Sequence, residues 1–397
     1  MPSSIVLSHK KPSVYLLGSL VSVPTMSMTL IAPAVPAVRS EFAISYAEAQ
    51  LIITVFLGAM ALGLLFVGLL SDRFGRRPVF VTGCALFFAA SVAGYMAPSS
   101  VMVIFVRAMQ GLSAAALMTT GRTIVNDIYH AHEASKALSS ITAVQSIVPI
   151  ISLAIGGLIV DLFGWRATFF VMSLVSGIVL VQSVLLIIET NQNKLPLLKL
   201  SGLAEAFGTV ISSTRWQLYS LCAGLQVGMF YSMNGYMPYH FGRLGASLSE
   251  FGFYYATISF GYMTGNLVNR HMGAKMSLGQ WVYVGSWLTF AMLVLIWLFD
   301  EFWMLSPPLL SFLLSVIGFA HGLLVANAII SSLQNTGRHA GSATGIGSAT
   351  HMVIGAIAGS VIIQLGGAEI FWICLLVNGI MAVISIWAAG RALRLAS

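Results

Sequence analysis

The chain has 397 residues, of which 58% are hydrophobic and only 8% are charged, and its formal net charge at pH 7 is +7. Soluble domains contain about 45–50% apolar and about 25% charged residues, so a water-soluble core could not bury this much apolar surface. The composition excludes a soluble globular protein. It predicts an all-α membrane protein, because helices satisfy their own backbone hydrogen bonds in lipid.

Apolar runs long enough to cross a bilayer recur along the whole chain. About 20 apolar residues are needed to span the hydrocarbon as a helix. We predict twelve transmembrane helices, at residues 14–38, 46–67, 78–97, 100–124, 138–160, 166–188, 218–240, 251–269, 278–299, 302–331, 341–365 and 369–390. The first run is too long for the apolar region of a signal peptide, and further spans follow it, so we expect it to be retained.

The longest polar interval divides these spans into two sets of six. We therefore expect an N-terminal six-helix bundle at residues 1–188, a central cytoplasmic loop at 189–217 and a C-terminal six-helix bundle at 218–397.

The basic residues predict the orientation of the chain. With the N-terminus in the cytoplasm, three basic residues lie on the far side: Arg39, Arg166 and Arg243. Fifteen lie on the cytoplasmic side: Lys10, Lys11, Arg73, Arg76, Arg77, Arg122, Lys136, Lys194, Lys199, Arg215, Arg270, Lys275, Arg338, Arg391 and Arg394. Cytoplasmic loops carry the excess of Lys and Arg, so both termini are predicted to be cytoplasmic. The charges are spread over separate segments, which argues against a nucleic-acid surface.

A dense group of charges lies between the second and third predicted spans, at residues 68–78. It contains Gly68, Asp72, Arg73, Gly75, Arg76, Arg77 and Pro78. The glycines permit close backbone approach and a tight bend, and the proline suits the first turn of the next helix. A weaker copy follows about half a chain length later, at residues 265–275, where Asn269 replaces the acid.

These patterns resemble the major facilitator superfamily. Residues 68–78 resemble its signature loop, and Arg107, Gln110 and Gly111 resemble the R-x-x-Q-G pattern of its fourth helix. Pro149 with Gly156-Gly157 resembles the antiporter motif of the Bcr/CflA branch of drug:proton antiporters. The resemblance implies two six-helix repeats with a substrate site between them. It also implies that the charged loop, together with Asp127, acts in gating.

Within the gate, we expect Asp72 to bond Arg76 or Arg77, or the start of helix eleven near Gly341, where the helix dipole favours an anion.

Three ionisable residues are predicted to lie deep in the membrane: Arg107, His321 and His351. Arginine at a helix centre costs roughly 2.5–3.5 kcal/mol on insertion scales, so it should face protein or a wet cavity. Each residue could couple substrate binding to proton movement, or could simply hydrogen-bond a neighbouring helix. His321 is the better candidate for titration, because His351 lies on a glycine stripe typical of tight helix packing.

All twelve acidic residues are predicted in loops or near helix ends, and Thr29 stands where the Bcr/CflA branch usually has an acid in its first helix. No buried carboxylate is therefore available to exchange a proton for a cation.

Other polar and aromatic residues are candidates for the substrate site, although each could instead pack between helices or face lipid. They are Gln110, Gln145, Gln226, Phe230, Tyr231, Asn234, Tyr255 and Asn327. The three cysteines are scattered, and neither a metal-ligand spacing nor a Walker loop is present. We expect no metal, no cofactor and no enzymatic activity.

Together these features predict a secondary active transporter of the inner membrane that exports small organic compounds by alternating access, with proton coupling. Its partners would be a small-molecule substrate, protons and the lipid bilayer, and we expect a monomer that binds no nucleic acid. One alternative is a transporter of an anionic metabolite, such as a carboxylate siderophore, because the deep groups are basic. Another is a non-transporting receptor or scaffold, against which the intact charged loop argues.

Overall fold

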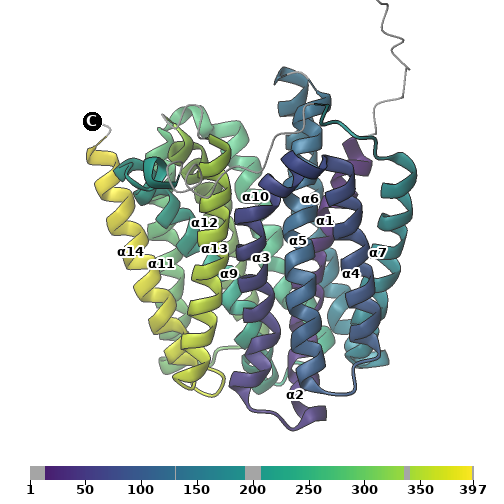
Figure 1. Cartoon of the computed structure of the whole chain (residues 1–397). Helices are drawn as coiled ribbons and strands as arrows, with labels where there is room; N and C mark the ends of the chain where they lie inside the picture. The colour runs from purple at the N-terminus through teal and green to yellow at the C-terminus, as the bar shows by residue number, and fades with distance from the viewer. Residues whose placement is uncertain (1–13, 130, 193–206, 335–339, 396–397) are drawn as a thin grey trace, which may run out of the picture.

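The structure, a computed structural model, describes residues 14–129, 131–192, 207–334 and 340–395. Within these residues all regular structure is helical, and long helices run alongside one another in a single bundle (Figure 1). In the first half, the elements are α1 (Val14–Leu30), the 3-10 helix η1 (Ala32–Ala34), α2 (Val35–Phe42), α3 (Tyr46–Phe74), α4 (Arg76–Tyr95), α5 (Ser100–Ile128), α6 (Ala131–Phe163) and α7 (Arg166–Leu186).

The second half begins after the central polar interval. It contains α9 (Thr214–Arg243), α10 (Leu248–Met272), the 3-10 helix η2 (Gly273–Lys275), α11 (Leu278–Phe302), α12 (Pro307–Leu333), α13 (Ala340–Gln364) and α14 (Phe371–Arg394). The start of α1 and the end of α14 lie at one end of the bundle, here called the terminal end. Helix α2 lies at the opposite end, here called the α2 end (Figure 1).

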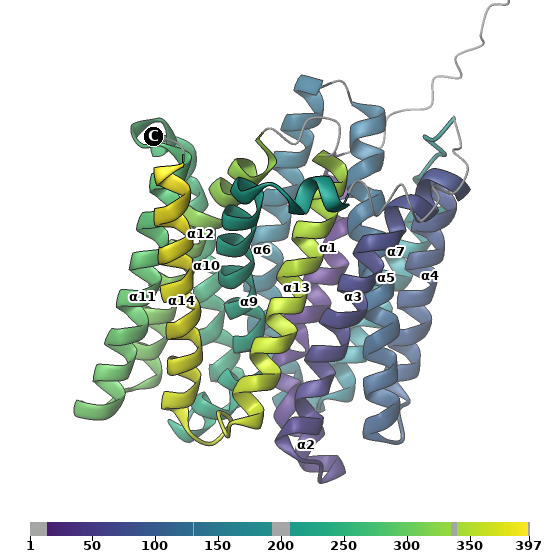
Figure 2. The ribbon, with the colours of Figure 1, turned by 60° about the vertical axis from the view of Figure 1, so that its left-hand side comes forward.

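Ten helices in the described part of the chain are long and apolar enough to cross a membrane. The remaining two predicted spans correspond to α9 and α10, which have 30 and 25 residues and run beside the others (Figure 2). These two helices are less apolar because they carry polar residues such as Gln226, Asn234 and Asn266. The protein is therefore a multi-pass membrane protein, as the composition predicts.

Several helices extend beyond the apolar runs that predicted them, whereas α12 begins at Pro307, inside its predicted span, and α7 ends two residues before the predicted end. The clearest case is residues 68–74, which were expected in a water-facing turn but form the last two turns of α3. Only Gly75 leaves the helix, with a φ of 107°, and an added side chain there would collide with the Glu189 carboxylate. Gly75 therefore makes the predicted bend, whereas an added Cβ at Gly68 would meet no atom within 4 Å. The expected close approach at Gly68 is thus wrong.

The two halves pack together along two pairs of helices, α3 with α13 and α6 with α10. Their polar and aromatic contacts gather toward the α2 end. The backbone N–H of Ser249 donates to Asp161 at 2.7 Å, and the rings of Tyr46 and Tyr239 meet edge to face with centroids 5.0 Å apart. Gly157 packs directly on the backbone of Leu248. The structure therefore shows a state that is closed at the α2 end.

Candidate substrate cavity and charged networks

A cavity of about 230 Å³ lies between the two halves. Its walls come from α1, α5 and α6 in the first half and from α9, α10 and α12 in the second half. This volume is slightly below the roughly 300–1,000 Å³ typical of ligand pockets, which suits a small compound. Apolar and aromatic side chains, including Met118, Phe230, Tyr231 and Tyr262, form most of the lining.

Arg122 supplies the permanent charge of this cavity. It lies on α5, one helical turn after Met118, which also lines the wall. Its Nη2 donates to Oε1 of Gln145 at 3.3 Å, and Nε2 of Gln145 donates to the carbonyl oxygen of Val21 at 3.1 Å. Gln145 therefore ties α6 to α1 and orients the guanidinium at the same time.

Two buried polar groups in the cavity wall lack partners in the described part of the chain. His321 on α12 is 3% exposed, and its Nε2 has no hydrogen-bond partner. Ser259 on α10 is 4% exposed, and its hydroxyl likewise has none. A buried polar group without a partner costs about 1–3 kcal/mol, so both groups could gain by binding a polar ligand.

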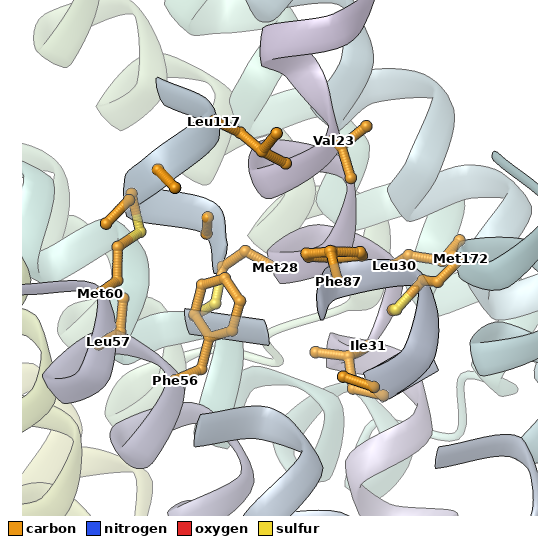
Figure 3. Close-up of a cluster of buried hydrophobic side chains, with 14 of the residues drawn as sticks. Val23, Met28, Leu30, Ile31, Phe56, Leu57, Met60, Phe87, Leu117 and Met172 are labelled. Atoms are coloured by element: carbon orange, nitrogen blue, oxygen red, sulfur yellow. The ribbon is translucent and has the colours of Figure 1, made fainter. Parts of the chain in front are cut away.

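Arg107 occupies a different place, inside the first half. It is fully buried, and it donates from Nε to the Ile52 carbonyl at 3.0 Å and from Nη1 to the Ser27 hydroxyl and to Gln110, each at 2.8 Å. Its guanidinium lies 4.1 Å from the ring centroid of Phe56. Phe56 belongs to the apolar cluster shown in Figure 3. Arg107 thus joins α5 to α1 and α3, and it does not line the central cavity.

His351 also packs between helices within one half. It is 6% exposed, and its Cδ2 would lie 3.1 Å from a Cβ added to Gly224 on α9. The glycine therefore permits the close approach of α9 and α13. This contact agrees with the packing interpretation of the glycine stripe.

The predicted substrate residues separate into two groups. Gln145, Phe230 and Tyr231 line the cavity together with His321. The remaining five lie outside its walls and contact neighbours within their own half: Gln110, Gln226, Asn234, Tyr255 and Asn327. For example, Gln110 donates to the Ser91 hydroxyl at 2.9 Å, and Asn327 donates to Asn269 at 3.0 Å.

Arg122 and Ser259 are cavity residues that the sequence did not single out as site residues. The sequence predicts Arg122 only as one of the cytoplasmic charges, because it lies near the end of a predicted span. The sequence does contain one signal for Arg122. This residue lies four positions after Met118, on the face of the fourth predicted span that also contains Gly111. The sequence alone did not show that this face continues to the cavity.

The predicted gating residues form a compact network at the terminal end. Arg76 pairs with Asp72, and its Nε donates to Asp127 on α5 at 3.2 Å. The backbone N–H of Arg76 donates to Glu189 at 2.9 Å, so the network also holds the start of the central interval. Arg77 donates to the Val184 carbonyl on α7 at 2.8 Å, whereas Arg73 lies over the ring of Phe74.

The predicted pairing of Asp72 with Arg76 is present. Contact of Asp72 with α13 is not made among the described residues. An added Cβ at Gly341 would meet no atom within 4 Å. In this state the network therefore joins elements of the first half to the central interval.

A bundle of this form, with a cavity between two halves and a charged network at one end, is that of a membrane transporter. The model of the Major Facilitator Superfamily matches residues 17–353. The chain therefore belongs to this superfamily.

Individual relatives and solved structures agree with this assignment. The chain is 25% identical over 359 residues to a bicyclomycin resistance protein homolog of Haemophilus influenzae, covering 88% of each chain. It is 31% identical over 156 residues to the multidrug resistance protein MdtL of Escherichia coli, covering 39% of this chain and 40% of that one.

Among solved structures, the fold resembles a D-xylose–proton symporter, with a TM-score of 0.72, 16% identity and coverage of 94% and 96%. It also resembles a bacterial homolog of the human lysosomal transporter Spinster, in an inward-facing and unoccupied conformation. There the TM-score is 0.69, the identity 15% and the coverage 96% and 95%.

Proposed function

We propose that this transporter exports small organic compounds from the cytoplasm and that a proton gradient drives the export. The observation that carries the proposal is the small, mostly apolar cavity between two halves that are closed together at the α2 end. Such a cavity can open first to one side of the membrane and then to the other when the two halves rock about it. The names of the relatives, a bicyclomycin resistance homolog and a multidrug resistance protein, support export of drug-like compounds.

The orientation is part of the proposal. Most of the described Arg and Lys residues lie near the terminal end, whereas Arg39, Arg166 and Arg243 lie near the α2 end. Positive charges favour the cytoplasmic side, so the terminal end would face the cytoplasm of a bacterial inner membrane. The state described here would then be closed on the outer side.

His321 is the proposed proton-carrying group. It is the histidine among the cavity-lining residues, where it shares the walls with Arg122, Tyr231 and Tyr262. Histidine changes charge near physiological pH when its environment permits, and opening of the cavity to water would allow this. Arg107 would act indirectly, by holding α1, α3 and α5 in the geometry that the cavity needs. His351 would hold α9 against α13.

Flux measurements in proteoliposomes test this proposal. Bicyclomycin and the fluorescent cation ethidium would be offered to liposomes under an imposed pH gradient, with a protonophore and protein-free liposomes as controls. We expect gradient-dependent accumulation of at least one compound, and His321→Gln should flatten its pH dependence while leaving thermal stability unchanged. If neither compound responds to the gradient, proton-driven export of this class of compound is rejected.

A further inference from the structure

The polar groups of the central cavity have an unbalanced charge. Arg122 contributes a guanidinium with five N–H donors, and in the described part of the chain it donates one hydrogen bond, to Gln145. None of the described Asp or Glu residues lines the cavity. The nearest acid along α5 is Asp127, which accepts hydrogen bonds from Arg76 and from Thr190 at the terminal end. The guanidinium therefore faces the cavity without a counter-charge from its walls.

The opposite walls add hydrogen-bonding groups. His321 and Ser259 come from the second half, and both line the same cavity as Arg122. The imidazole Nε2 and the hydroxyl are buried without partners. A ligand that bridges the two halves could thus pair with a cation on one side and with these two groups on the other.

The remaining side chains of the cavity wall are mostly apolar or aromatic, and they determine which shape and polarity the uncharged part of the ligand can have. Phe230, Tyr231 and Tyr262 supply aromatic surface, and Ile258 and Val325 supply aliphatic surface. Flat rings pack well against such surfaces. A fully polar ligand such as a polyol would leave this apolar lining without complementary contacts.

We propose that the substrate is a small organic anion, a carboxylate attached to a flat apolar body, which binds in this cavity with its carboxylate on Arg122. The proposal rests on the transport function proposed above and names its substrate class. The guanidinium offers a planar pair of donors that fits the two carboxylate oxygens. His321 and Ser259 act as positioning groups that hydrogen-bond the substrate from the second half. The ligand then contacts both halves, as alternating access requires.

Arg107 does not compete for this role. Its donors are engaged by Ile52, Ser27 and Gln110, and its guanidinium is covered by Phe56. An anion could reach it only by displacing these contacts. The two arginines of α5 therefore have separate functions, one in packing and one in binding.

Equilibrium binding to purified full-length protein in lipid nanodiscs tests the proposal without any gradient. The probes are 2-naphthoate, 2-naphthamide and 2-naphthylmethylamine, which share a ring system and carry an anionic, a neutral and a cationic group. We expect 2-naphthoate to bind at least about tenfold more tightly than the other two, because a charge-assisted pair is stronger than a neutral hydrogen bond. Arg122→Gln should remove this preference, whereas Arg122→Lys should keep part of it.

A matched control separates binding from general loss of positive charge. Arg215→Gln removes an arginine that lies at the start of α9, outside the cavity walls, and bonds Gln334. It should leave the affinity for 2-naphthoate unchanged. Thermal unfolding of each variant would show that it is folded, and the double substitution of His321→Gln with Ser259→Ala should weaken binding without removing the preference for the anion.

The outcomes of this test are distinct from those of the flux assay. Preference for the amine or the amide, no saturable binding of the naphthoate at millimolar concentration, or an unchanged preference in Arg122→Gln would each overturn the proposed substrate class. Gradient-driven flux of ethidium or bicyclomycin would still stand in that case. Conversely, anion binding that depends on Arg122 but is accompanied by no gradient-driven flux of 2-naphthoate, ethidium or bicyclomycin would uphold this site and reject proton-driven export.

Discussion

Replacing Gly157 with alanine should drive the protein out of the state that is closed at the α2 end. The glycine lies on α6, where a Cβ would collide with the carbonyl oxygen of Leu248 on α10 and lie 3.0 Å from the carbonyl carbon. These are backbone atoms, so rotation of a side chain cannot relieve the contact. Overpacking of this kind typically costs about 1–3 kcal/mol.

The cost falls on one conformation only. Alanine is favoured over glycine in a helix by roughly 1 kcal/mol, but this gain is the same whether the α2 end is open or closed. The collision exists only where α6 meets α10. A difference of about 1–3 kcal/mol changes a two-state ratio by roughly 5–150-fold, which is large enough to reverse a moderate preference.

Distances between spin labels would measure the shift. Phe163 at the end of α6 and Leu365 after α13 are 73% and 58% exposed and lie in different halves near the α2 end, so both accept a label. The three native cysteines are buried and would first be replaced by alanine. We expect a longer distance population to grow in Gly157→Ala.

Gly58→Ala provides the matched control, because a Cβ added to this helical glycine of α3 would meet no atom within 4 Å. It should leave the distance distribution of the parent protein unchanged. If Gly157→Ala gives the same distribution as Gly58→Ala, the close backbone contact does not control closure, and the reasoning is refuted.

Three further substitutions test the buried and charged networks. Arg107→Ala should lower the free energy of unfolding by about 2–4 kcal/mol. The substitution removes hydrogen bonds worth about 0.6 kcal/mol each in membrane proteins and the packing contacts of a buried side chain. Thermal unfolding that matches the wild type would contradict this. Asp72→Asn removes the partly buried ion pair with Arg76 and should slow flux several-fold, while stability changes by about 1 kcal/mol. Wild-type flux in this variant would exclude a gating role. His351→Gln should lower the midpoint of thermal unfolding, because it disturbs the contact of α13 with Gly224 on α9. It should leave ligand affinity unchanged. Weaker ligand binding would instead place His351 in the substrate site.

The fold could be predicted from the sequence because its causes are local. Apolar runs of about 20 residues do not depend on which helices are neighbours. The predicted positions of the helix ends were less accurate. Residues 68–74 are polar but continue α3, since a helix can extend beyond the hydrocarbon until a residue such as Gly75 ends it.

The site was only partly predictable, because the side of a helix that faces the cavity depends on how the helix is rotated in the bundle. Arg107 and Arg122 lie on the same helix, and the sequence favoured the one nearer its middle. In the structure, Arg107 is enclosed by α1 and α3, whereas Arg122 reaches the space between the halves. Of the three deep ionisable residues, only His321 lies in the cavity wall, and Gln110, a candidate for the substrate site, donates to Ser91 inside its own half.

The charge of Arg122 has a consequence for how the transporter would respond to voltage. If the site carries one organic anion, the loaded cavity is electrically neutral, whereas the substrate-free cavity carries the positive charge of Arg122, and that of a proton on His321 when one is bound, through the membrane field. A full crossing is worth about 2.3 kcal/mol per 100 mV, so a negative cytoplasm would draw the empty site back toward the side where substrate is loaded. The return of the empty carrier would then be the voltage-sensitive step of the cycle, and the outward movement of the loaded carrier would be indifferent to membrane potential.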